Sequence, residues 1–143
     1  NLVAQLREIY RPSSTGNETS FNLVSLVSEV QSLLRGQLKN GNVEWVCEPP
    51  ANGQWVTKGE KDQIKQVFIN ICTNGIEAMQ PEGGRLELIF MQGSPESQEV
   101  GVLVRDTGPG MSPEYTDQRH HGRLSARNYE RGAEFAVWLR SIV

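Results

Sequence analysis

Two asparagines stand one helical turn apart in a segment whose apolar residues recur at helical spacing. Asparagine is a mediocre helix former because its side chain competes for backbone hydrogen bonds, so Asn70 and Asn74 within one helix need an explanation. Together with Glu77 they fall within an arc of about 60° along one edge of the apolar stripe. Amide and carboxylate oxygens are ligands that Mg²⁺ accepts beside water and phosphate oxygens. An ordinary solvated helix face is the alternative interpretation.

A carboxylate followed by a glycine-rich loop comes directly after a valine-rich strand. The residues are Asp106, Thr107, Gly108, Pro109 and Gly110. A carboxylate at a strand end can accept a hydrogen bond from an exocyclic amine, and the glycines let a ligand approach the backbone closely. A plain turn is the alternative, since glycine and proline are common in turns. The loop matches neither the dinucleotide fingerprint nor a P-loop, because no Gly-Lys-Ser/Thr follows.

Two helices are expected to carry most of the core. In the first, Asn22 serves as N-cap, Phe21 packs onto Leu26, and the helix ends between Gly36 and Asn42. The second is the longest and runs from about residue 61 to 79, with an apolar stripe that a Pro-Glu-Gly-Gly sequence ends.

Strand patterns surround these helices. Residues 43–47 and 55–57 are predicted to form a hairpin, and further strands are predicted at 86–90, 100–104, 124–126 and 135–139. Helices on one face of a mixed, mainly antiparallel sheet give the economical architecture, an α+β two-layer sandwich.

Composition limits the classes of function. The chain has 143 residues, which suits one domain, and a net charge of −3, which gives no basic field to attract nucleic acid. It has no apolar run of membrane-spanning length, so we expect a soluble domain, and a buried free thiol suits the reducing cytoplasm. Cys72 is expected to be a buried free thiol, and Cys47 lacks metal-ligand spacing. His120 and His121 are expected to be structural.

Together, the two polar groups resemble the asparagine box and the first glycine box of sensor histidine kinases. The boxes correspond to residues 66–79 and 102–111, and the spacing between them also fits. This family belongs to the ATPase superfamily shared with gyrase and the ninety-kilodalton heat-shock chaperones. The resemblance covers nearly the whole chain, because residues 1–12 look like the end of the dimerising helix pair, and residues 121–128 and 132–139 look like the last two strands.

The resemblance implies roles for five residues and two cofactors, ATP and Mg²⁺. Asp106 would bind the adenine amine, and Gly108 and Gly110 would shape the loop beside the base. Asn74 would ligate Mg²⁺, and Asn70 would assist at the metal and phosphates.

Position 70 also separates two branches of the superfamily. The ATP hydrolases place a glutamate there to activate water, whereas Asn70 cannot take a proton. The residue therefore favours the branch that transfers phosphate to a histidine. Glu77 is a weaker candidate, as an outer partner of the metal site or a solvated residue.

The chain lacks other parts of the family pattern. The phosphoacceptor histidine, with its flanking glutamate and proline, is not in the sequence, so the catalytic residues are unknown. Residues 112–119 are too few for the phenylalanine box, lid and second glycine box that cradle the phosphates. Three explanations are open: the segment exists but is missing from this sequence, it was removed by design, or the protein is a naturally degenerate relative.

The expected organisation is the end of a dimerisation helix at 1–12, a linker at 13–20 and an ATP-binding domain at 21–143. The expected function is to supply the γ-phosphate of ATP for autophosphorylation of a histidine outside this chain. The parent would be a homodimer, with the histidine-containing dimerisation domain and a response regulator as partners. The alternative is a lidless, degenerate domain that acts as an interaction or regulatory module.

Overall fold

The computed structural model describes residues 19–51, 55–94, 96, 98–108, 115–117, 122–129 and 132–140. In chain order, the elements are β1 (Thr19–Asn22), α2 (Leu23–Asn40), β2 (Val43–Cys47), β3 (Val56–Gly59), α3 (Lys61–Ala78), β4 (Gly84–Gln92), β5 (Glu99–Asp106), β6 (Tyr115–Asp117), β7 (Gly122–Tyr129) and β8 (Gly132–Arg140).

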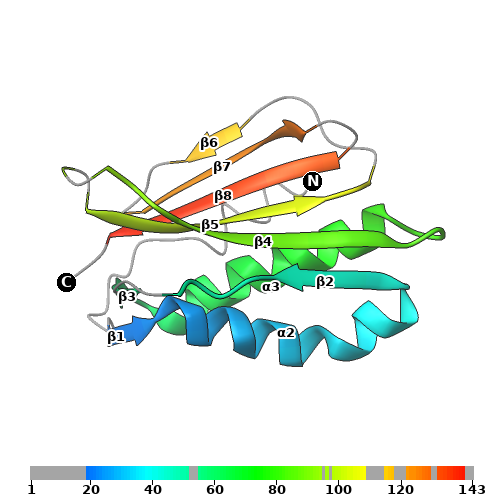
Figure 1. Ribbon diagram of the computed structural model, residues 1–143, viewed down its shortest axis with the longest axis horizontal. Helices are drawn as coiled ribbons and strands as arrows, with labels where there is room; N and C mark the ends of the chain where they lie inside the picture. Colours follow the sequence, from blue (N-terminus) through cyan, green and yellow to red (C-terminus); the bar gives the residue numbers. More distant parts are fainter. Residues whose placement is uncertain are drawn as a thin grey trace.

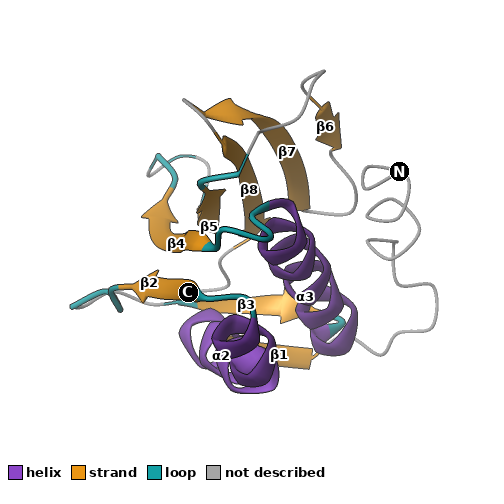
Figure 2. Ribbon diagram, turned by 90° about the vertical axis from the view of Figure 1, so that its right-hand side faces the viewer, coloured by secondary structure: helices purple, strands orange, loops and turns teal. Residues whose placement is uncertain are grey.

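The strands form one large sheet and one small sheet. The large sheet has the order β2-β4-β5-β8-β7-β6, and β1 pairs with β3 in the small one. The β2–β4 pair is parallel, whereas the other pairs are antiparallel. Helices α2 and α3 lie on the same side of the large sheet, which curves over α3 (Figure 1, Figure 2). The predicted α+β sandwich is confirmed. Neither α2 nor α3 carries an apolar stretch that could span a bilayer.

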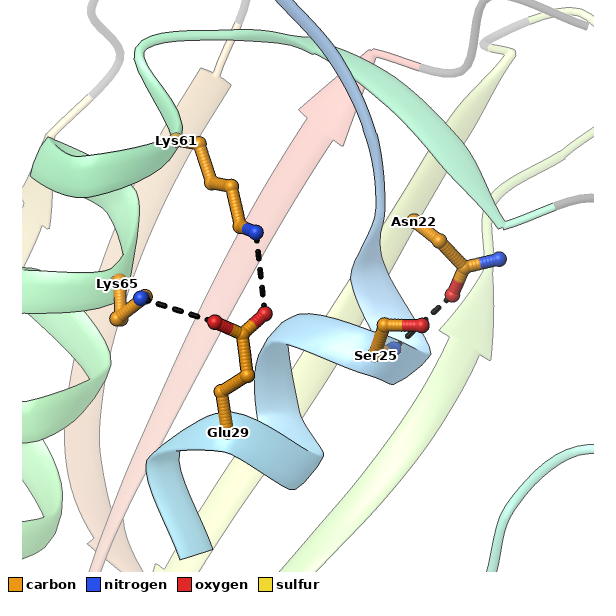
Figure 3. A network of polar contacts seen from close by, with 5 residues as sticks. All are labelled: Asn22, Ser25, Glu29, Lys61 and Lys65. Atoms are coloured by element: carbon orange, nitrogen blue, oxygen red, sulfur yellow. Dashed lines mark hydrogen bonds and ion pairs between the residues drawn. The ribbon is translucent and has the colours of Figure 1, made fainter. Parts of the chain in front are cut away.

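Helix α2 begins where the sequence predicts. The side chain of Asn22 accepts a hydrogen bond from the backbone N–H of Ser25 at 3.0 Å, which satisfies a donor that the first turn leaves without a helical partner (Figure 3). The N–H of Leu23 donates to the carbonyl of Trp55 at 2.8 Å and so ties the helix start to the chain just before β3.

Helix α3 packs beside α2 and is tied to it by charge. The Glu29 carboxylate lies 3.1 Å from Lys61 Nζ and 3.0 Å from Lys65 Nζ, so one acidic side chain of α2 holds two lysines of α3 (Figure 3). The hydrogen bond from Lys65, and then that from Lys61, lower the pKa of Glu29. These groups are partly exposed to solvent, so they orient the helices more than they stabilise them.

The core lies between the helices and the large sheet. Its helical part repeats at spacings of three and four, and its sheet part takes every second residue, which places those side chains on the face toward the helices. The main buried side chains are Leu23, Leu26, Val27, Val30, Leu34, Ile64, Val67, Phe68, Ile71, Cys72, Leu86, Leu88, Val100, Val102, Val104, Phe135, Val137 and Leu139. Burial raises the pKa of the Cys72 thiol, and its predicted role as a buried free thiol is confirmed.

The predicted hairpin of residues 43–47 and 55–57 is wrong. Strand β3 pairs with β1, which places Phe21 opposite Thr57, and β2 pairs instead with β4. Thr19 and Ser20, assigned to the linker by sequence, belong to β1. A four-residue strand with one large apolar side chain gives little local signal, and the partner of a parallel strand lies far along the chain.

Adjacent leucines of α2 give a matched test of the packing. Leu34 is 2% exposed and Leu33 is 60% exposed. Leu34→Ala should lower the free energy of unfolding by about 2–5 kcal/mol, because it leaves a cavity against the sheet. Leu33→Ala should change it by less than about 0.5 kcal/mol. Urea denaturation measures both, and equal losses would contradict the assigned orientation of α2.

Candidate functional site

Asp106 is the last residue of β5 and faces the helix layer. Strand alternation places it on the same face as Val102 and Val104, and it is 8% exposed. Opposite it stands Gly75 of α3, where a Cβ would lie 3.4 Å from Asp106 Oδ2 and 3.1 Å from Leu86 Cδ1. A glycine in mid-helix costs about 1 kcal/mol relative to alanine, and here it lets the helix backbone approach the carboxylate.

Two backbone donors orient the Asp106 carboxylate. Its Oδ1 accepts from the N–H of Gly108 at 2.9 Å and from the N–H of Ala133 at 3.2 Å. Within the described part of the chain, the carboxylate makes no other hydrogen bond, so Oδ2 retains its acceptor capacity. The side chain is therefore a fixed acceptor beside α3.

The environment of this carboxylate is poor in water. Burial raises the pKa of Asp106, while the hydrogen bonds from Gly108 and Ala133 offset part of that rise. No cation is paired with it within the described residues. A buried, oriented carboxylate of this kind discriminates strongly in favour of a ligand that brings an N–H donor.

The loop after Asp106 is anchored by Thr107. Its hydroxyl accepts from the N–H of Arg85 at 3.1 Å and donates to Met79 Sδ at 3.3 Å. Gly84 leaves room for this arrangement, because a Cβ there would lie 2.3 Å from Thr107 Oγ1. The start of the loop is thus fixed to both β4 and the end of α3.

Asn70 and Asn74 lie on α3 at the border between core and solvent, as predicted. Both side chains are half-buried, while Glu77, one turn further, is exposed. Asn74 Nδ2 donates to the carbonyl of Asn70 at 2.7 Å, and Asn70 Oδ1 accepts from Gln66 Nε2 at 3.1 Å. The anchored nitrogen of Asn74 leaves its amide oxygen as the group that points away from the helix backbone.

These amides fit a magnesium ion that arrives with a ligand. The Asn74 oxygen accepts no hydrogen bond within the described part of the chain, and an amide oxygen is a suitable Mg²⁺ ligand. Among the described residues, no group of three His, Cys, Asp or Glu side chains could hold a metal unaided. Phosphate oxygens and water would have to supply the other ligands.

The structure places some, but not all, of the site residues that were predicted from the sequence. Gly108 is buried in the loop, where a Cβ would lie 3.2 Å from the carbonyl oxygen of Ala78, whereas Gly110 lies outside the described residues. His120, His121 and the segment at 1–12 also lie outside them. Gly75 and Ala133 were missed. The mid-helix glycine was a visible signal, but the Ala133 backbone donor leaves no trace in its side-chain type.

A family model matches residues 59–139, which is more than half of the chain, and its description is "Histidine kinase-, DNA gyrase B-, and HSP90-like ATPase". The chain belongs to this family. The match runs from the end of β3 to the end of β8 and so includes both the asparagines and the Asp106 loop. Membership implies ATP binding.

Curated relatives place the domain among the sensor histidine kinases. It is 30% identical over 110 residues to sporulation kinase A of Bacillus subtilis (strain 168), a match over 77% of this chain and 17% of that protein. It is 31% identical over 120 residues to sporulation kinase D of the same organism, over 81% of this chain and 22% of that protein. The chain therefore spans less than a quarter of the length of these relatives.

Solved structures agree with this placement. The catalytic domain of histidine kinase ThkA matches with a TM-score of 0.72 and 26% identity, over 87% of this chain and 96% of that one. Histidine kinase AdeS of Acinetobacter baumannii matches with a TM-score of 0.70 and 14% identity, over 99% of this chain and 76% of that one, and so supports the fold alone. The predicted identification as a histidine kinase ATP-binding domain is confirmed.

The burial of Asp106 predicts a pH-dependent stability. Its pKa is raised above the ordinary 3.8, so its contribution to stability is fully present below about pH 3.8 and is lost as the pH rises through the raised value. Asp106→Asn keeps an acceptor for Gly108 and Ala133 but carries no charge. The stability that it gains over the unaltered kinase domain should therefore grow as the pH rises through the pKa of Asp106.

Urea denaturation of the ligand-free domain from about pH 3 to pH 8 measures this difference. Asp62→Asn, which changes an exposed carboxylate on the first turn of α3, is the control. A difference for Asp106→Asn that is constant across this range, or no larger than the control, would contradict the raised pKa.

Proposed function

We propose that this domain binds Mg-ATP, with the exocyclic amine of adenine on Asp106 and the phosphates toward Asn70 and Asn74. The observation that carries the proposal is the buried Asp106 carboxylate, whose Oδ1 is held by two backbone N–H groups and whose Oδ2 faces α3 at Gly75. Adenine presents the N–H donor that such a group selects. Gly108 and Gly110 would lie beside the base.

Asn74 is proposed as the protein ligand of Mg²⁺, through its amide oxygen. Asn70 is proposed to assist at the metal and the phosphates, which requires its oxygen to be shared with or released by Gln66. Bound Mg²⁺ would neutralise charge on the phosphates. Asn70 cannot act as a general base, so the site favours phosphate transfer to an acceptor over activation of water for hydrolysis.

The proposed role of the parent protein is to transfer the γ-phosphate to a histidine on its own dimerisation domain. The named relatives are kinases, and ThkA has been solved in a complex with the response regulator TrrA. We propose a homodimeric parent with a response regulator as its relay partner, and a cytoplasmic position for this domain. Residues 1–12 are proposed to be the end of the dimerisation helix, and the residues between them and β1 are proposed to link it to the ATP-binding domain.

Nucleotide binding and phosphate transfer need different parts of the domain, so we treat them as two separate proposals for this chain. The short sequence of residues 112–119 leaves no room for a lid and a phosphate-cradling helix N-terminus. We propose that the chain alone binds nucleotide but does not complete the transfer. Family membership favours this role over that of an interaction module without nucleotide.

Removal of the Asp106 carboxylate should weaken nucleotide binding selectively. Asp106→Ala should raise the Kd for Mg-ATP about ten- to hundredfold, because a hydrogen bond to a charged group is lost. Asp62→Ala, which removes an exposed carboxylate from the first turn of α3, should leave the Kd unchanged. Isothermal titration calorimetry measures both, and an equal Kd for the two variants would rule out the adenine site.

The metal role of Asn74 predicts a different signature. Asn74→Ala should reduce the gain in ATP affinity that Mg²⁺ confers, while affinity in the presence of EDTA stays within about twofold. Titrations with and without Mg²⁺ separate the two quantities. Asp62→Ala, at an exposed position on the first turn of α3, is again the control. Loss of affinity to the same degree in both conditions would show that Asn74 supports the fold and not the metal.

A further inference from the structure

The orientation of the Asp106 carboxylate depends on a donor from a distant part of the chain. Gly108 lies two residues away in the same loop, so its hydrogen bond moves with Asp106. Ala133 belongs to β8, and its N–H reaches Asp106 Oδ1 at 3.2 Å. This second bond forms only when β8 stands at the correct distance from the end of β5.

Strand β8 approaches β5 closely at this point. The ladder between them ends with Arg105 opposite Glu134. Just beyond it, a Cβ at Gly132 would lie only 1.7 Å from the carbonyl oxygen of Asp106, so no side chain fits there. Small lateral shifts of β8 would therefore change the Ala133 hydrogen bond directly.

An ion pair lies directly behind the site. Arg105 Nε donates to Glu134 Oε2 at 2.6 Å, and the two side chains are 24% and 5% exposed. Because successive side chains of a strand point to opposite faces, this pair lies on the face opposite to Asp106. It joins the same two strands, one residue before Asp106 and one residue after Ala133.

The burial of this ion pair is better explained by a role in positioning β8 against β5 than by a contribution to the stability of the fold. A buried ion pair is often no more stabilising than apolar side chains of similar volume, because desolvation offsets the attraction. A short charged hydrogen bond nevertheless has a preferred distance and direction, which apolar contacts lack. The neighbouring pair on this face, Leu103 opposite Ala136, cannot set the strand separation in that way.

We propose that the Arg105–Glu134 ion pair is a positioning element of the adenine site, holding β8 so that the Ala133 N–H orients Asp106 for the exocyclic amine. The inference rests on the proposed function. Both residues act through Ala133 and are positioning residues, separate from those that would contact the nucleotide. Their effect is on the selectivity for a base that carries the amine.

The test compares ATP with purine riboside triphosphate, which lacks only the exocyclic amine. Glu134→Gln, which removes the charge at almost constant volume, should raise the Kd for ATP about tenfold. The Kd for purine riboside triphosphate should change less than about twofold. Arg105→Lys keeps the charge but not the guanidinium geometry, and it should shift the ratio of the two dissociation constants in the same direction. Because Arg105 is more exposed than Glu134, this variant takes the place of Glu134→Gln if that variant does not fold.

Glu87→Gln is the matched control. Glu87 stands opposite Arg105 on β4, in the same row of the sheet, but its strand does not carry Ala133. Its ratio of the two dissociation constants should equal that of the unaltered chain. Circular dichroism confirms that each variant is folded before titration.

Three results would separate the possible failures. Equal weakening of both nucleotides in Glu134→Gln, or no weakening of ATP, would overturn the positioning role. The same shift in Glu87→Gln would show a general effect of charge on this face and would also overturn it. Equal affinity of the unaltered chain for the two nucleotides would instead overturn the adenine site itself.

Discussion

The close approach of α3 to the end of β5 is the constraint on which the rest of the site depends. Gly75 brings the helix backbone against Leu86 and the Asp106 carboxylate, so the helix that carries the asparagines and the strand that carries the acid meet without a gap. A larger side chain at this point would separate the two, because packed interiors have no spare volume. The proposed adenine site at the end of β5 and the proposed Mg²⁺ site on α3 therefore both depend on the contact between Gly75 and Asp106.

Much of this arrangement could be predicted from the sequence because the signals are local. The apolar stripe of α3 fixes which face is buried, and helical geometry then places Asn70 and Asn74 together on its border. The alternation in β5 likewise determines that Asp106 points toward the helices. Resemblance to a known family added the chemical roles, which periodicity alone does not provide.

Other features depend on contacts between distant segments and could not be predicted locally. The pairing of β1 with β3 joins residues on either side of α2 and β2, and the strand pattern of each is too short to identify its partner. The Ala133 donor is a backbone group, so every residue type except proline would present it. Its importance arises from where β8 stands, which only the tertiary structure defines.

The parallel pairing of β2 with β4 has a consequence for how the molecule is assembled. Parallel neighbours need a crossover, and here the crossover contains α3. Strand β2 can pair with β4 only after that long connection has folded back. Bringing the two strands together costs loop-closure entropy before any contact between them forms. The helix that presents the asparagines is thus also part of the link between β2 and β4, so a change that displaces α3 would affect both the sheet edge and the site.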